Sequence, residues 1–124
     1  MFAVLASSKS GHGSATPLVL DLEHLRRFTM GQLAFEREIL GLFSASLAQT
    51  LMSLESADSA SQWHMAAHTL KGSALGIGAG QLAALAREAE QLRYISPADR
   101  GPIMGRIRTA AADVLSEARR HQLL

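Results

Sequence analysis

The sequence contains no cysteine, which excludes disulfides, thiolate metal sites and cysteine nucleophiles. This absence fits a reducing compartment, and we expect a cytoplasmic protein. Aromatic residues are few as well, with one Trp, one Tyr and four Phe in 124 residues. Ala and Leu are abundant instead, which favours helices that approach one another closely over a sheet.

Neither sign of charge is in excess, because 12 Lys and Arg stand against 11 Asp and Glu. A nonspecific nucleic-acid binder carries a clear positive excess, so we do not expect nucleic acid as a partner. Long apolar runs are also lacking, which excludes a membrane partner through a spanning helix. The apolar start, Met1 to Ala6, is short and has no basic flank before it, so it does not predict a signal peptide.

The length is that of one domain, and the first residues differ from the rest. Residues 1–17 lack periodicity and are rich in small and polar residues, which predicts a mobile N-terminal leader. Residues 18–124 carry apolar residues at helical spacing, with short connections between the helices. They predict an all-α fold, an antiparallel up-down-up-down four-helix bundle with a short additional N-terminal helix. This bundle is complete within one chain, so we expect a monomer.

Capping residues and apolar spacing predict five helices. The first and short one begins after Asp21 as N-cap. The third runs from about Asp58 to Ile77, and the fourth opens near Gly80. Ser96 followed by Pro97 predicts the cap and first turn of the last helix. The apolar positions of the five helices are, in order, Leu22, Leu25 and Phe28; Phe35, Ile39, Leu42, Phe43, Leu47, Leu51 and Leu54; Trp63, Ala66, Ala67, Leu70, Ala74 and Ile77; Leu82, Leu85, Ala89 and Leu92; and Ile107, Ala111, Val114 and Ala118.

One histidine of the third helix lies off its apolar stripe. At about 100° per residue, His68 is roughly 140° around the helix axis from Trp63, so its imidazole should face solvent. Lys71 and Gly72 follow three and four residues later and lie beside it on the next turn. The sequence thus predicts an exposed imidazole, a cation within its reach and a position without a side chain.

The run His68-x-x-Lys71-Gly72-Ser73, followed by Ile77-Gly78-Ala79, resembles the histidine-containing phosphotransfer (HPt) domain family of bacterial and plant phosphorelays. The resemblance extends from about Asp21 to about His121. It implies a phosphocarrier in which His68 accepts a phosphoryl group from a receiver-domain aspartyl phosphate and passes it to another receiver aspartate. The implied partners are response-regulator receiver domains and a hybrid sensor kinase. The receiver would supply Mg²⁺, so we expect no cofactor in this chain.

The two neighbours of His68 fit this chemistry. Lys71 disfavours the imidazolium form of the nucleophile and can pair with incoming phosphoryl oxygens. Gly72 leaves room for those oxygens, although glycine within a helix costs about 0.5–1 kcal/mol relative to alanine. The alternative interpretation is that Gly72 only permits close helix packing.

A ring partner for His68 is expected on the following helix, where an acceptor would hold one nitrogen and so fix the attacking tautomer. Glu88 and Glu90 are both candidates, and about 200° separates them around the helix axis, so periodicity leaves the choice open. In the HPt family the position 22 residues after the histidine holds a glutamine or glutamate that bonds the ring. The resemblance therefore implies Glu90.

Three further residues surround His68 on the same helix. We interpret His64, Met65 and Leu75 as part of a partner-docking surface, with partial burial of Met65 and Leu75 as the alternative. His64 and His68 also have the spacing of a helical metal pair. No third ligand is evident, so we expect no metal site.

Other functions remain open at this point. Sensor-kinase dimerisation domains also display a histidine, but an acidic residue and then a proline usually follow it, unlike Thr69-Leu70-Lys71-Gly72 here. A detached phosphotransfer domain of a chemotaxis-type kinase would suit Glu90. The chain could also be a helical interaction scaffold that is never phosphorylated. The glycines at 76, 78 and 80 lack the lysine of a nucleotide-binding loop, so we expect no ATP-dependent autokinase activity.

Overall fold

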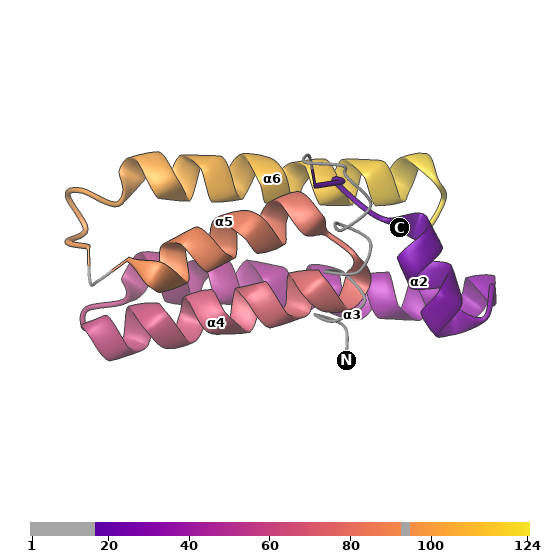
Figure 1. The fold of residues 1–124 in the computed structure, drawn as a ribbon, viewed down its shortest axis with the longest axis horizontal. Coiled ribbons are helices and arrows are strands. Elements are labelled where there is room, and N and C mark those ends of the chain that lie inside the picture. The colour runs from indigo at the N-terminus through magenta and orange to yellow at the C-terminus, as the bar shows by residue number, and fades with distance from the viewer. Residues whose placement is uncertain (1–16, 93–94) are drawn as a thin grey trace.

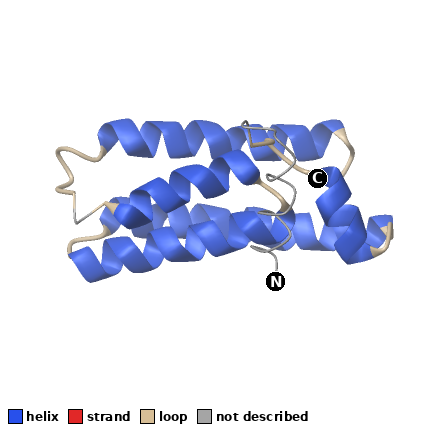
Figure 2. Cartoon of the chain, in the orientation of Figure 1, coloured by secondary structure: helices blue, strands red, loops and turns tan. Residues whose placement is uncertain are grey.

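The computed structural model describes residues 17–92 and 95–124. In this part of the chain the helices are α2 (Leu22–Thr29), α3 (Leu33–Ser56), α4 (Ala60–Ile77), α5 (Gly80–Gln91) and α6 (Gly101–Arg120). The last four run alternately up and down side by side, and α2 lies at one end of the bundle (Figure 1). The described residues contain no strand (Figure 2). The predicted all-α four-helix bundle with a short extra helix is confirmed.

Local caps define the ends of α2 and α4. The Asp21 carboxylate accepts a hydrogen bond from the His24 N–H at 3.1 Å, as expected of an N-cap. The Ser59 hydroxyl does the same for the Gln62 N–H at 3.1 Å. At the other end of α4, Gly78 adopts a φ of 83°, the left-handed conformation that glycine tolerates best. Its carbonyl accepts from the Asp21 N–H at 2.8 Å, which joins the end of α4 to the start of α2.

Helix α4 has the buried face that the sequence predicts. All six residues of its expected stripe are buried, and Trp63 and Ala67 are completely inaccessible. The partner face on α5 consists largely of alanines, with Ala83, Ala86 and Ala89 buried beside Leu82. Small side chains let two helices approach closely, so α5 lies tightly against α4 and carries its own side chains near the exposed face of α4.

The apolar spacing overestimates the core at four positions, of which Phe28 in α2 is 47% exposed. Phe35 and Leu42 of α3 are 39% and 67% exposed, because the buried face of this helix follows Leu40, Phe43 and other residues instead. Seven apolar positions form a wider stripe than the single side that α3 turns toward its neighbours. The prediction that Leu92 faces the core is also wrong, since α5 ends at Gln91 and Leu92 is 41% exposed.

The last helix begins later than predicted. Ser96 and Pro97 do not start α6, because the Asp99 N–H donates to the Ser96 carbonyl at 2.9 Å and residues 97–99 form a turn. The helix starts at Gly101, with Pro102 in its first turn. Its expected inward residues are all buried, and the four arginines at 106, 108, 119 and 120 are exposed.

Arg100 connects several segments at this end of the bundle. Its role could not be predicted from the sequence. Arg100 is only 4% exposed. Its guanidinium lies 5.1 Å from the ring centroid of Trp63. Its terminal nitrogens donate at 2.7–3.0 Å to the carbonyls of Leu54, Glu55, Ala57 and Ile95. One side chain therefore supplies donors to the C-terminal end of α3 and to the loop before α6.

The predicted leader falls mostly outside the described residues, since these begin at Pro17. The Pro17 carbonyl accepts from the Gln81 side-chain amide at 3.2 Å, which places the start of the described chain against α5. Where the structure describes the chain, no helix combines the length and the apolar character needed to cross a bilayer.

Arg100→Met should lower the free energy of unfolding by about 3 kcal/mol, because it leaves buried carbonyls without their charged donor. Urea denaturation followed by circular dichroism measures this loss. Arg119→Met is the matched control, since it removes an exposed arginine of α6 and should change the stability by less than about 0.5 kcal/mol. Equal effects of the two substitutions would contradict the role of Arg100.

Candidate functional site

His68 lies on the solvent-facing side of α4, opposite the buried stripe. Its side chain is 65% exposed. Gly72, one turn later, is exposed too, and a Cβ added there would meet no atom within 4 Å among the described parts of the neighbouring helices. The structure therefore gives no support to the packing interpretation of Gly72, and the space beside His68 is open.

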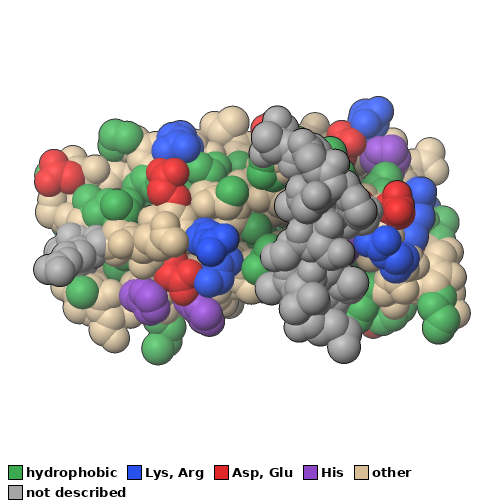
Figure 3. All heavy atoms as spheres, viewed as in Figure 1, with side chains coloured by type: hydrophobic (Ala, Val, Ile, Leu, Met, Phe, Trp, Pro, Cys, Tyr) green, Lys and Arg blue, Asp and Glu red, His purple; other side chains and the backbone are tan. Residues whose placement is uncertain are grey.

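Glu90 joins His68 to Lys71. Its Oε2 lies 2.5 Å from His68 Nδ1, and its Oε1 accepts from Lys71 Nζ at 2.5 Å. The Glu90 side chain is 12% exposed, against 65% for His68. Figure 3 shows the corresponding group on the surface, with two histidines beside an acidic and a basic side chain over α4 and α5. Glu88 faces α6 instead, where it pairs with Arg106 at 2.8 Å.

The two bonds to Glu90 favour its ionised form. The pKa of Glu90 is lowered from the ordinary value of 4.5, chiefly by the hydrogen bond from Lys71 and then by the one from His68, while burial opposes the shift. Glu90 is therefore a carboxylate at neutral pH and accepts a proton donor at His68 Nδ1. In the neutral ring this assigns the proton to Nδ1, which leaves the exposed Nε2 with a free lone pair.

Lys71, the cation predicted within reach of His68, pairs with Glu90. Its side chain is 25% exposed, and its ammonium group is held by the Glu90 carboxylate. The charge thus acts first on Glu90. Any further acceptor would have to share the three N–H donors of Lys71 with Glu90.

The predicted docking residues occupy different environments. Met65 is 67% exposed. The His64 side chain is 62% exposed, and its ring stacks on that of His68 with centroids 6.3 Å apart and 13° between the planes. Leu75 is only partly exposed and packs against the core, which is the alternative left open for it. Whether these side chains contact a partner stays a prediction.

His64 and His68 have no third metal ligand beside them among the described residues. In residues 17–92 and 95–124, no group of three or more His, Cys, Asp or Glu side chains is arranged to hold a metal ion.

The match to known families decides the assignment. The model of the Hpt domain family matches residues 38–120. The chain belongs to the Hpt domain family. No curated protein and no solved structure gives a significant match. Hpt domains carry phosphoryl groups in two-component systems, where they interact with receiver domains and kinases and are not enzymes in the usual sense.

Two contacts of this Hpt domain could not be predicted from the sequence. The Trp63 indole Nε1 donates to the Ala89 carbonyl at 2.9 Å, and His64 Nδ1 lies 3.3 Å from the Glu90 carbonyl. A buried tryptophan needs an acceptor for its indole N–H. The sequence does not show that this acceptor is the Ala89 carbonyl, 26 residues away. Both contacts fix the end of α5, the segment that carries Glu90.

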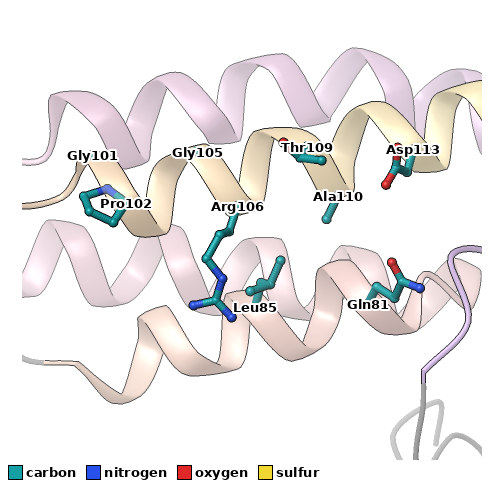
Figure 4. A pocket seen from close by; sticks show the side chains of 9 residues that line it. All are labelled: Gln81, Leu85, Gly101, Pro102, Gly105, Arg106, Thr109, Ala110 and Asp113. Atoms are coloured by element: carbon teal, nitrogen blue, oxygen red, sulfur yellow. The ribbon is translucent and has the colours of Figure 1, made fainter.

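A groove lies between α5 and α6. This groove of about 580 Å³ is lined by Gln81, Leu85, Gly101, Pro102, Gly105, Arg106, Thr109, Ala110 and Asp113. Arg106 extends across it from α6 toward α5 (Figure 4). His68, Lys71 and Glu90 do not line the groove, so it is separate from the histidine site.

Lys71→Met should raise the pKa of Glu90 toward 4.5, because the hydrogen bond from Lys71 is the largest cause of its lowering. Lys71→Arg keeps a cation and should keep the pKa low. Carboxyl ¹³C shifts measured by NMR across a pH titration report both values. An unchanged titration in Lys71→Met would contradict the shared carboxylate.

The same shift has a signed effect on stability. A lowered folded-state pKa contributes stability above the unfolded-state pKa, and this contribution is lost as the pH falls through the folded-state value. Glu90→Gln should therefore lose less stability than the wild type when the pH is lowered through the region below about 4.5. Thermal unfolding at successive pH values measures the difference, and a steeper loss in Glu90→Gln would contradict the assigned sign.

Proposed function

We propose that this Hpt domain accepts a phosphoryl group on Nε2 of His68 from the aspartyl phosphate of a receiver domain, and passes it to an aspartate of another receiver. The observation that carries the proposal is the bond between Glu90 and His68 Nδ1. With one nitrogen held, the other is directed to solvent and free to attack.

One bond forms and one bond breaks in the transfer, and both involve only the Hpt domain and the receiver domain. The Nε2 lone pair attacks phosphorus, an N–P bond forms, and the P–O bond to the receiver aspartate breaks. The aspartate leaves as a carboxylate on the receiver. The imidazole ring then carries a positive charge with its proton still on Nδ1, and the adjacent Glu90 carboxylate stabilises that charge. Return of the phosphoryl group to another aspartate reverses these steps.

Lys71 supplies a positive charge for the phosphoryl oxygens. Because phosphoryl transfer depends mainly on positioning and charge stabilisation, a single ammonium beside the nucleophile suits this task. In the resting site Glu90 holds that ammonium, and we infer that Lys71 turns to the phosphoryl oxygens as they arrive. Mg²⁺ would be held by the receiver domain, and Gly72 would leave room for the incoming group.

The decisive experiment follows radiolabel from a panel of phosphorylated receiver domains, including those of hybrid sensor kinases, to this protein. The wild type should take up label that is labile in acid and stable in alkali, as expected of phosphohistidine. His68→Gln should take up none, while His121→Gln, which removes a histidine after the end of α6, should be labelled like the wild type. Absence of label from every receiver, in folded protein, would favour the interaction scaffold.

Lys71→Ala should slow transfer about tenfold or more, because a charge-assisted hydrogen bond to the phosphoryl group is lost. Single-turnover rates with a labelled receiver measure the change, and circular dichroism checks the fold. Arg119→Ala removes an exposed cation elsewhere and should leave the rate unchanged. A wild-type rate in Lys71→Ala would remove the phosphoryl-binding role.

A further inference from the structure

The last turn of α5 is tied to α4 by two side chains. The final carbonyls of a helix have no partner within it, and α5 ends at Gln91, one residue after Glu90. Trp63 Nε1 donates to the Ala89 carbonyl at 2.9 Å. His64 Nδ1 lies 3.3 Å from the next carbonyl, that of Glu90 itself. Neighbouring residues of α4 thus contact neighbouring carbonyls of α5.

His64 contacts both His68 and Glu90, two of the residues in the proposed reaction. Its ring stacks on the His68 ring at 6.3 Å, nearly parallel. Its Nδ1 faces the Glu90 main chain, and its Nε2 lies 3.8 Å from Glu90 Oε2. The groups that face His64 in the described structure are therefore the Glu90 carboxylate, the His68 imidazole and, across the carboxylate, the Lys71 ammonium.

We propose that His64 is a positioning residue for phosphoryl transfer: it donates from Nδ1 to the Glu90 carbonyl and confines the His68 ring by stacking, so that the Glu90 carboxylate stays on His68 Nδ1. This inference rests on the proposed function. It differs from the docking interpretation of His64, because the contacts that carry it are all within this chain.

The position of Glu90 explains why such a tie matters. No further helical turn follows Glu90 to hold its main chain, and the carboxylate has to meet an imidazole on another helix at 2.5 Å. Trp63 is fully buried and donates to the preceding carbonyl, so this bond does not restrain Glu90 directly. His64 contacts the Glu90 main chain itself, through its Nδ1.

The contact between His64 and the Glu90 carbonyl should matter most during phosphoryl transfer. In the resting site Lys71 and His68 both hold the Glu90 carboxylate. When Lys71 turns to the phosphoryl oxygens, the carboxylate loses one of these two bonds. The contact between His64 and the Glu90 carbonyl does not involve Lys71, so it still restrains the residue at that stage.

The test compares His64→Ala with His64→Asn. An asparagine amide can place its nitrogen near the position of Nδ1 and so keep a donor for the Glu90 carbonyl, although it lacks the full ring. His64→Ala should slow single-turnover transfer from a labelled receiver about three- to tenfold, the effect of losing one ordinary hydrogen bond. His64→Asn should recover most of the rate. His121→Ala, which removes the histidine that follows the C-terminal end of α6, should match the wild type.

The second readout is the His68 ring itself, observed by ¹⁵N NMR of the unphosphorylated protein. In its neutral form, the wild-type ring should show a proton on Nδ1 and a bare Nε2. In His64→Ala the two nitrogen shifts should move toward each other, as the proton becomes distributed between both positions, and His64→Asn should reverse this change. Circular dichroism and thermal unfolding show whether each variant is folded.

The outcomes separate this inference from the proposed function. If the wild type takes no label from any receiver, the proposed function fails, and the inference that rests on it fails too. If the wild type is labelled but His64→Ala matches it in rate and ring shifts, only the inference is overturned. Slower transfer with unchanged His68 shifts would assign His64 to the receiver contact and also overturn it, as would equal losses in His64→Ala and His64→Asn.

Discussion

One carboxylate, that of Glu90, is the group on which the site depends. It accepts from His68 Nδ1 through one oxygen and from the Lys71 ammonium through the other, both at 2.5 Å. Because Glu90 belongs to α5 and the other two to α4, the arrangement exists only if the helices pack in one register. The buried alanines of α5 allow the close approach, and the bond from Trp63 to the Ala89 carbonyl fixes the register beside Glu90. Packing in the core thereby sets the geometry around the exposed His68 imidazole.

Much of this arrangement can be predicted from the sequence, because α4 follows one simple rule. Its apolar residues repeat at helical spacing, so the buried face and the exposure of His68 follow from the angle per residue. The caps Asp21 and Ser59 are equally local, since each bonds an N–H three residues later. Glu90 is different. Helical periodicity does not show whether Glu88 or Glu90 faces His68, and only the resemblance to the HPt family implies Glu90.

Most of what could not be predicted depends on contacts between distant parts of the chain. Arg100 reads as an ordinary charged residue, yet it is buried because carbonyls from the end of α3 and from the loop before α6 converge on it. The start of α6 at Gly101 lies beyond a turn in which the Asp99 N–H donates to the Ser96 carbonyl, although local rules assign Ser96 and Pro97 to a helix start. Leu42 is apolar but points away from the neighbouring helices. For Arg100 and Leu42, tertiary packing overrides the local pattern.

The most direct test is to identify the nitrogen that carries the phosphoryl group. Protein labelled with ¹⁵N and phosphorylated by a receiver domain should show ³¹P–¹⁵N coupling to Nε2 of His68, because Glu90 holds Nδ1. Coupling to Nδ1, or to another histidine, would contradict the view that the Glu90 carboxylate directs the nucleophile.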